Sequence, residues 1–555
     1  MNFLDRMRQS RVSVDRSLIP DDPASLSQES ESPRRSIPVP PAALTRFVVY
    51  PKDVSATELL TVYVDARHVG TAPYLTWFQD LCRAHSNVRV EQKSAEELED
   101  LRQELAARQA RPDEADQKTL NKAWRLFEDC AAIGATDMHL LIREQTAQVQ
   151  VRVKGDLKVV ENHSMYRDEG EALARAIYSG LSTVKDNAYK PLEFQNAQIK
   201  GAVFPGAGLS SIRIIRGPAY PVEDGGSFLI ARLQGERTTS PSDGKRTGAR
   251  PLSLRVPDIP ADPIRLATMG FTERQMELIE EIIRLPYGIT VVTGPTGSGK
   301  TTTLNEAMRY QAQLFPGARQ ITVEDPVEYP QPWAIQLQGI GGAFQDRVAS
   351  MLRMDPDIIL IGEIRQAAEG VSAIQAAMTG HFVWTTAHVN DPYEVFSRLE
   401  VMDPALLPRA LTCNHTLIGA ITSQRVVSIL CPDCRQPLAK RQDAIPGFML
   451  RALQSWGDLS QVHVRGEGCN RCEGDAIVRK QAVAEIVMTS EDLMEDILER
   501  GVVKARRNHR RKPGSDKSML ANAMDLVLAG KLDPVDAHRG VDKIEFKDKH
   551  QGDAE

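Results

Sequence analysis

GPTGSGKT, residues Gly294–Thr301, is the most informative motif in this 555-residue chain. It follows the apolar run Ile289–Val292, which predicts a buried strand, and it precedes Thr302–Tyr310, which predicts a helix. Glycines at this spacing let backbone N–H groups turn toward phosphate oxygens, and the positive end of the following helix adds to that attraction. Such a pattern also arises by chance, but the flanking strand and helix favour a loop that binds the phosphates of a nucleoside triphosphate.

Within this loop we expect Lys300 to lie over the terminal phosphates and the Thr301 hydroxyl to bind Mg²⁺. The residues expected to contact ATP and its metal ion are Gly294, Thr296, Gly297, Ser298, Gly299, Lys300, Thr301 and Thr302. Predicted strands and helices alternate from Leu252 to Asn414, which indicates a mostly parallel α/β domain around the loop.

Length and composition narrow the remaining possibilities. The chain is too long for one core, so roughly three or four domains are expected. A net charge of −6 does not support a surface that follows nucleic acid along its whole length, although it allows a local basic groove. No apolar run approaches the roughly 18–20 residues that span a bilayer, and the first residues lack a signal-peptide core. We therefore expect a cytoplasmic protein.

Composition changes along the chain predict its domains. Residues 1–44 are rich in Ser, Pro and Arg and are expected to be disordered. Residues 45–115 predict a small α/β domain with a linker helix, which a capping box at Ser94–Glu97 would open. The following segments are a strand-rich α+β domain at 116–234, a linker at 235–251, the P-loop domain at 252–414, a cysteine-bearing subdomain at 415–490 and a helical tail at 491–555.

Carboxylates follow two further predicted strands. Glu324, Asp325 and Glu328 come after one strand, and Glu363 follows the continuous apolar run Ile358–Ile361. The carboxyl ends of parallel strands line the ligand crevice of such a sheet. A carboxylate there can hold magnesium through water, or orient and deprotonate the attacking water. For Glu363, a solvated glutamate in a turn is the other interpretation.

Two histidines, His381 and His388, bracket the strand-like run Phe382–Ala387. A lone histidine is more often a satisfied core residue than a functional one. Two of them at the ends of one strand, in a P-loop domain, favour a role in sensing the bound phosphate.

Four of the seven cysteines form two CxxC pairs, Cys431/Cys434 and Cys469/Cys472, separated by 34 residues. Two such pairs present four thiolates, which is the ligand set of a tetrahedral zinc site. With four protein ligands the site would be closed and structural. A disulfide is the first alternative, disfavoured in a reducing compartment, and a redox CxxC is the second, although it does not need a second pair.

Taken together, these motifs resemble the traffic ATPases of bacterial type II secretion and type IV pilus systems, over about Gly134–Asp536 and most densely over Gly288–Asn390. The resemblance implies a multi-domain α/β protein in which a RecA-like P-loop domain follows a PAS-like α+β domain. In that family Lys300 and Thr301 would be the Walker A pair, Glu363 the Walker B glutamate, Glu324, Asp325 and Glu328 the aspartate box, and His381 and His388 the histidine box.

The resemblance also assigns a role to Arg213 and Arg232, which match family arginines that reach the γ-phosphate when domains close. A guanidinium delivered there stabilises charge on the transferred phosphoryl group. Without the resemblance, both would be interpreted as strand-surface charges. Gln366 and Ala349 depart from the family pattern outside the phosphate-contacting core, which puts family-type subunit contacts in doubt rather than hydrolysis.

The function implied by the resemblance is that of a hexameric ATPase, with ATP, Mg²⁺ and Zn²⁺, that powers type IV pilus assembly or type II export through an inner-membrane platform protein. Its tetracysteine element is typical of assembly and secretion members rather than retraction members. A nucleic-acid translocase or helicase shares the P-loop and is the main alternative, and a non-hydrolysing scaffold is another. We interpret the basic run 504–512 as a solvated loop, with contact to anionic lipid as the alternative.

Overall fold

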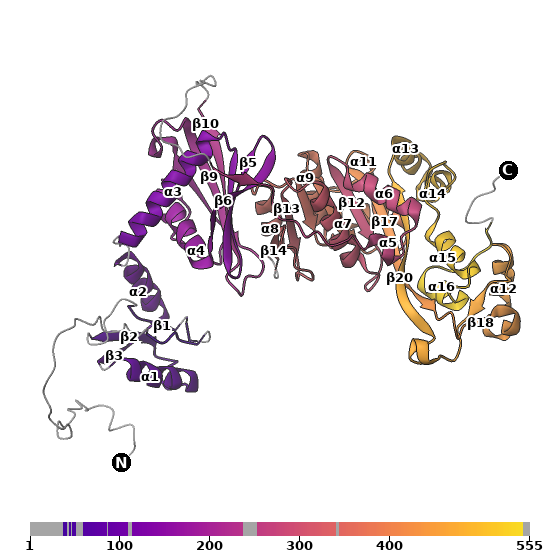
Figure 1. Cartoon of the computed structure of the whole chain (residues 1–555), viewed down its shortest axis with the longest axis horizontal. Helices are drawn as coiled ribbons and strands as arrows, with labels where there is room; N and C mark the ends of the chain where they lie inside the picture. Colours follow the sequence, from indigo (N-terminus) through magenta and orange to yellow (C-terminus); the bar gives the residue numbers. More distant parts are fainter. Residues whose placement is uncertain are drawn as a thin grey trace, which may run out of the picture. The chain divides into compact units, whose positions relative to one another are not determined.

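The computed structural model describes residues 37–41, 44–45, 47–51, 59–85, 87–108, 114–236, 252–339 and 343–547. The chain separates into two compact units, residues 1–113 and 114–555 (Figure 1), and each is described by itself. Most of the segment expected to be disordered, 1–44, and most of the expected linker, 235–251, lie outside the described residues. In the part of the chain that is described, no helix has the length and apolar character required to cross a bilayer.

The first unit is a small three-stranded sheet covered by a helix. Strand β2 pairs with β1 in antiparallel and with β3 in parallel fashion. Trp77 and Leu81 of helix α1 share a buried cluster with Val62 of β2. The predicted capping box is confirmed, because the Ser94 amide donates to the Glu97 carboxylate at 2.8 Å and the Glu97 amide donates to Ser94 Oγ at 3.2 Å. The elements are β1 Val48–Val49, β2 Leu60–Asp65, α1 Ala72–Ala84, β3 Val88–Lys93 and α2 Ala95–Arg108.

The second unit begins with a strand-rich domain whose sheet has the order β11-β6-β5-β4-β10-β9-β8-β7. Phe127 of helix α3, Leu173 of helix α4 and Val149 of β5 belong to one buried cluster, so these helices cover one face of the sheet. The elements are α3 Glu114–Ala132, β4 Asp137–Ile142, β5 Thr146–Val153, β6 Asp156–Tyr166, α4 Arg167–Arg175, β7 Val184–Lys185, β8 Gln195–Lys200, β9 Leu209–Pro218, β10 Ser227–Gly235 and β11 Leu254–Arg255.

A seven-stranded sheet of order β14-β13-β15-β16-β12-β17-β20 follows. Every neighbouring pair is parallel except β17 and β20. Its strands are β12 Gly288–Thr293, β13 Gln320–Glu324, β14 Ile335–Gln338, β15 Ile358–Ile361, β16 Phe382–Ala387, β17 Ile418–Leu430 and β20 Ile477–Met488. The predicted multi-domain α/β architecture, with a P-loop domain after an α+β domain, is therefore confirmed.

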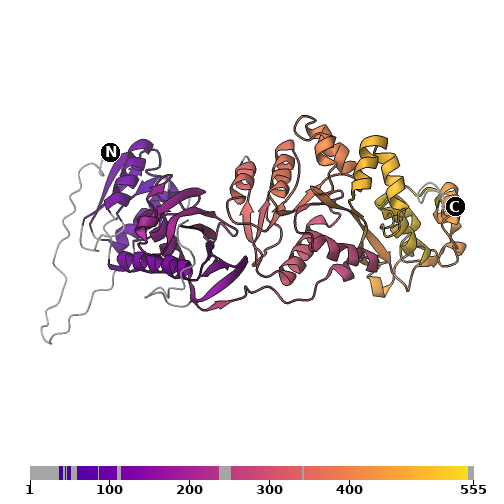
Figure 2. The same cartoon turned by 90° about the horizontal axis from the view of Figure 1, so that it is seen from above.

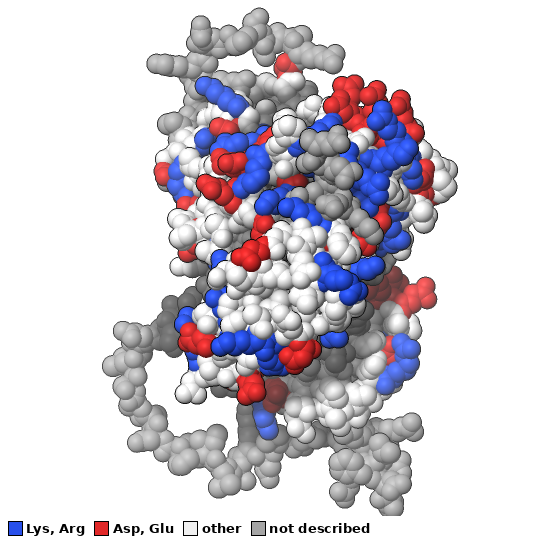
Figure 3. Space-filling view, turned by 90° about the vertical axis from the view of Figure 1, so that its right-hand side faces the viewer, with Lys and Arg blue, Asp and Glu red and all other residues white. Residues whose placement is uncertain are grey.

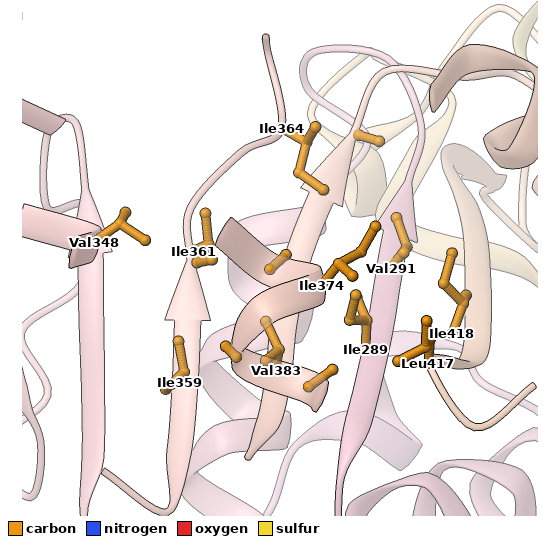
Figure 4. Packing of buried hydrophobic residues seen from close by; sticks show 14 of the residues in the cluster. Ile289, Val291, Val348, Ile359, Ile361, Ile364, Ile374, Val383, Leu417 and Ile418 are labelled. Atoms are coloured by element: carbon orange, nitrogen blue, oxygen red, sulfur yellow. The ribbon is translucent and has the colours of Figure 1, made fainter. Parts of the chain in front are cut away.

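Helices cover both faces of this sheet (Figure 2). Val291 and Val383 point into one apolar cluster, which helices α8 and α9 complete and which Figure 4 shows from close by. Val292 and Trp384, the next residues along the same strands, point into a second cluster with α6 and α7. Because successive side chains of a strand alternate between faces, strands buried on both sides read as continuous apolar runs. The helices are α5 Leu266–Met269, α6 Glu273–Ile283, α7 Lys300–Leu314, α8 Ala343–Met351, α9 Ala367–Met378, α10 Val395–Met402 and α11 Arg409–Thr412.

The P-loop sheet continues beyond Asn414, where the sequence predicted the domain to end. Strand β17 pairs with β12, and β20 pairs with β17. The cysteine-bearing segment is thus an insertion between the last two strands, because the chain leaves the sheet after Leu430 and returns at Ile477. It contains β18 Gln436–Pro437, α12 Gly447–Gln454 and β19 His463–Val464.

The C-terminal helices pack on these elements. Helix α15, Met519–Leu528, shares an apolar cluster with the cysteine-bearing insertion. The interpretation of the basic run as a solvated loop is wrong: most of it is helix α14, Val502–Arg510. Within it Arg510 donates to Glu485 and Arg506 donates to Asp391, so acidic partners on the P-loop domain hold this helix. The other C-terminal helices are α13 Glu491–Arg500 and α16 Pro534–Gly540.

Candidate nucleotide-binding site

The phosphate-binding loop connects β12 directly to helix α7. Gly294, Gly297 and Gly299 have φ values of 143°, 78° and 81°, which favour glycine. A Cβ on Gly294 would lie 2.5 Å from the carbonyl oxygen of Gln424, so the loop passes too close to β17 for a side chain. The strand, loop and helix predicted from the sequence are therefore present in this order.

A cavity of about 710 Å³ lies against this loop at the carboxyl ends of β13, β15 and β16. Its volume falls within the range of roughly 300–1,000 Å³ typical of ligand sites. Predicted residues in its walls are Thr296, Gly297, Ser298, Gly299, Lys300, Thr301, Thr302, Glu324, Asp325, Glu328, Glu363 and His388. Most of the residues predicted from separate motifs are thus brought together around one cavity.

Lys300 folds back onto its own loop. Its Nζ donates to the carbonyl oxygens of Gly294 at 2.9 Å and Pro295 at 3.1 Å. Burial lowers the pKa of Lys300; the negative charge of Glu363 acts against this shift and the positive charge of Arg425 adds to it. A phosphate group in the cavity would offer this ammonium a full negative charge in place of two neutral carbonyls.

The carboxylate of Glu363 contacts the side chains of His388 and Arg365. Its Oε1 lies 3.0 Å from Nε2 of His388, and its Oε2 accepts from Nε of Arg365 at 2.8 Å. The Thr386 hydroxyl donates to the carbonyl oxygen of Gly362 at 2.8 Å and joins the ends of β15 and β16. These contacts fix the carboxylate at the wall of the cavity, where it can take a proton from water.

The three residues of the aspartate box differ in their surroundings. Glu324 is 6% exposed, and its Oε1 accepts from the Thr322 hydroxyl at 2.5 Å and from the Gln336 amide at 3.1 Å. Burial raises the pKa of Glu324. Asp325 and Glu328 are exposed at the cavity, where carboxylates can orient water molecules around a metal ion.

His381 lies away from the cavity, contrary to what its predicted phosphate-sensing role requires. Its Nδ1 is 3.0 Å from both Thr379 Oγ1 and the carbonyl oxygen of Ala376. It precedes β16, whereas His388 follows it, and a strand of this length separates its two ends by roughly 20 Å. The two histidines therefore do not act as a pair, because opposite ends of one strand reach opposite edges of the sheet.

The structure also keeps Arg213 and Arg232 away from this cavity. They lie directly opposite one another across β9 and β10. Arg232 donates to Asp137 at 2.9 Å and to Asp355 at 2.9 Å. Asp355 precedes β15, whereas Glu363 follows it, so Arg232 is bound at the sheet edge opposite the nucleotide site.

Two residues that were not predicted from the sequence, Gln424 and Arg425, lie beside the loop. The Gln424 side-chain amide donates to the carbonyl oxygen of Ser298 at 2.6 Å. Arg425 is 7% exposed and donates to the side chain of Asn390 at 3.0 Å. They follow the part of β17 that pairs with β12, so assigning β17 to the sheet would have placed them at its carboxyl edge.

The four cysteines of the two CxxC pairs converge. Their ligand atoms all lie within 4.8 Å of one another. The Sγ–Sγ distances are 3.7 Å for Cys431–Cys469, 3.8 Å for Cys434–Cys472 and 3.7 Å for Cys469–Cys472. Four sulfurs at about 2.3 Å from a tetrahedral zinc ion would lie about 3.8 Å apart, so the donor set fits this metal. All four are free thiols, so the disulfide alternative is not realised.

Comparison with known proteins agrees with this site. The family model described as "Type II/IV secretion system protein" matches residues 245–539, more than half of the chain. Type II secretion system protein E of Pectobacterium carotovorum subsp. carotovorum is 32% identical over 301 residues, 48% of this chain and 55% of its own. The type IV pilus assembly ATPase PilB of Thermus thermophilus is 27% identical over 411 residues, 72% of this chain and 41% of its own.

These matches therefore span about half the length of the relatives. Among solved structures, the pilus retraction motor PilT with bound ADP aligns over 75% of this chain and 95% of its own, with 18% identity and a TM-score of 0.36, which is too low to carry an argument. On the extent of the family match, the chain belongs to the type II/IV secretion system protein family.

Proposed function

We propose that this chain is an ATP-hydrolysing motor that works as a homohexamer in the cytoplasm, at the inner membrane, and powers type IV pilus assembly or type II secretion through a platform protein. The observation that carries the proposal is the single cavity that brings Lys300, Thr301 and Glu363 together at the carboxyl edge of the sheet. Family membership supports the same activity.

The geometry supports separate roles for the residues that bind phosphate and those that bind Mg²⁺. The loop amides and Lys300 would bind the terminal phosphates of ATP, which draws Nζ away from Gly294 and Pro295. The Thr301 hydroxyl, with Asp325 and Glu328 through water, would hold Mg²⁺. When bound, this ion offsets negative charge on the phosphates.

Glu363 would orient the attacking water and take its proton. His388 and Arg365 hold the two carboxylate oxygens in the present arrangement, so one of these contacts must loosen when water is accepted. His388 is the histidine that reaches the site. Through its contact with Glu363 it would connect the position of that carboxylate to the end of β16.

Arg213 and Arg232 would act only after a domain movement. Asp355 and Asp137 hold Arg232 at the opposite sheet edge, so the strand-rich domain must leave Asp355 before either arginine meets a nucleotide. Rotation of this domain is the motion that would drive export. The tetracysteine cluster would hold Zn²⁺ as a structural element that shapes the insertion.

On the face drawn in Figure 3, basic and acidic side chains are interspersed, which gives no specific support to a nucleic-acid translocase. Analytical ultracentrifugation of the full chain with a non-hydrolysable ATP analogue tests the proposed assembly. We expect a species of six chains that Lys300→Ala fails to form, whereas Lys190→Ala, at an exposed lysine outside the cavity, assembles normally. A chain that stays monomeric with saturating nucleotide would contradict the proposal.

A further inference from the structure

A second cavity, of about 640 Å³, lies where the strand-rich domain meets the P-loop domain. Its walls include Arg319, which precedes β13, and Arg143, which follows β4. Because β13 ends at Glu324 in the nucleotide cavity, this second cavity is at the other end of the same strand. It is therefore separate from the site described above.

The Arg319 guanidinium is buried and donates to no carboxylate among the described residues, although the negative charges of Asp357 and Asp355 act to raise its pKa. Arg319 is 2% exposed, and within the described part of the chain its Nε has no hydrogen-bond partner. The guanidinium donates only to the neutral side-chain oxygen of Gln150 among the described residues. Burial, followed by the positive charges of Arg143 and Arg152, lowers the pKa of Arg319 to about 9. A buried charge left in this state is costly, and a bound anion would relieve that cost.

Arg143 adds a second positive charge to the same cavity. Its guanidinium donates to the carbonyl oxygens of Ala334 at 2.8 Å and Pro332 at 3.2 Å, and to no carboxylate within the described part of the chain. Arg152 donates to the carboxylates of both Asp355 and Asp357, and Asp357 also accepts the backbone N–H of Arg319 at 2.5 Å. The carboxylates in the cavity wall, Glu144, Asp224 and Asp258, are exposed and form no ion pair with Arg143 or Arg319 among the described residues.

We propose that this cavity binds a phosphate group, held by Arg319 and Arg143. Guanidinium groups bind phosphate through parallel N–H···O bonds, and the Arg319 guanidinium, which lines the cavity, keeps N–H groups that donate to no acceptor among the described residues. The group belongs either to free inorganic phosphate or to a mononucleotide, because the cavity is large enough for both and the aromatic residues Tyr220 and Trp333 are among those that line it.

Equilibrium dialysis of the full chain with labelled inorganic phosphate, and separately with labelled AMP, tests this site. The Lys300→Ala background weakens phosphate binding at the nucleotide site. In this background we expect one remaining binding event, and Arg143→Gln should weaken it at least tenfold. Arg284→Gln is the matched control, because Arg284 is an exposed arginine that pairs with Glu280 and does not line the cavity, and it should leave binding unchanged.

Comparing inorganic phosphate with AMP shows whether the site binds free phosphate or a mononucleotide. Equal binding of phosphate and AMP identifies a site for the phosphate group alone, whereas tighter binding of AMP identifies a mononucleotide site; both outcomes support the proposal. Arg319→Gln should have the same effect as Arg143→Gln, and circular dichroism checks its folding. If Arg319→Gln does not fold, the binding measured with Arg143→Gln tests the proposal, because Arg143 is only half-buried. Absence of both ligands from the Lys300→Ala chain, or binding that Arg143→Gln leaves intact, would overturn the proposal.

Discussion

A buried ion pair fastens helix α14 to the P-loop sheet, and its strength can be worked out from the structure. Glu485 on β20 has a side chain that is 2% exposed, and its two oxygens each accept an N–H group of Arg510 at 2.7 Å. Asp391 lies 3.8 Å from the same guanidinium. Breaking a buried pair costs roughly 3–5 kcal/mol, because a charge remains without its partner. Since Asp391 stays in place after Glu485→Gln, we expect the lower end, about 3 kcal/mol.

Hydrogen exchange of the α14 amides measures this loss where it occurs, without assuming that the whole chain unfolds in one step. A loss of about 3 kcal/mol corresponds to roughly a hundredfold faster exchange. Glu280→Gln is the matched control: Glu280 accepts from Arg284 at 2.8 Å, but the two side chains are 47% and 51% exposed, so the expected change in α6 is below about 0.5 kcal/mol. If Glu485→Gln changes exchange no more than Glu280→Gln does, the argument from burial is refuted.

Three further predictions address other parts of the molecule. Cys472→Ser removes one of four converging thiolates, so zinc measured by atomic emission should fall from about one ion per chain to near zero; unchanged zinc would argue against the site. His388→Ala should slow ATP turnover at least tenfold, because this side chain holds Glu363, whereas His381→Ala should change turnover less than twofold; equal effects would contradict the separation of the two histidines. Burial lowers the pKa of His139 to about 4, so the folded chain favours the neutral ring and the unfolded chain is protonated first, near pH 6.5. Up to about 3 kcal/mol of stability, present above pH 6.5, should be lost as the pH falls to 4; His139→Gln should flatten this dependence in denaturant titrations, and an unchanged slope would show that other groups cause it.

The parts of the fold that could be predicted from sequence depend on local patterns. The loop Gly294–Thr301 needs glycines at fixed positions, and the capping box at Ser94–Glu97 needs only four neighbouring residues. Apolar runs such as Ile358–Ile361 identify strands covered on both faces. Motifs at the carboxyl ends of parallel strands therefore pointed correctly to one cavity.

What could not be predicted depends on contacts between distant segments. The P-loop domain was predicted to end at Asn414. Its last strand, β20, follows the insertion that carries the cysteines, so no local sequence pattern shows that the sheet continues beyond that residue. Helix α14 looked like a solvated basic run because its partners Asp391 and Glu485 are distant in sequence. The pairing of Arg232 with Asp355 likewise spans two domains.

Steady-state ATP hydrolysis by the purified chain and by Glu363→Gln, each with and without added DNA, would show whether the chain is an ATPase whose base is Glu363. We expect turnover that DNA leaves unchanged and that Glu363→Gln reduces at least a hundredfold, because the attacking water loses its base. Strong stimulation by DNA would contradict this expectation in favour of a nucleic-acid motor, and turnover that survives Glu363→Gln would contradict the assignment of the site.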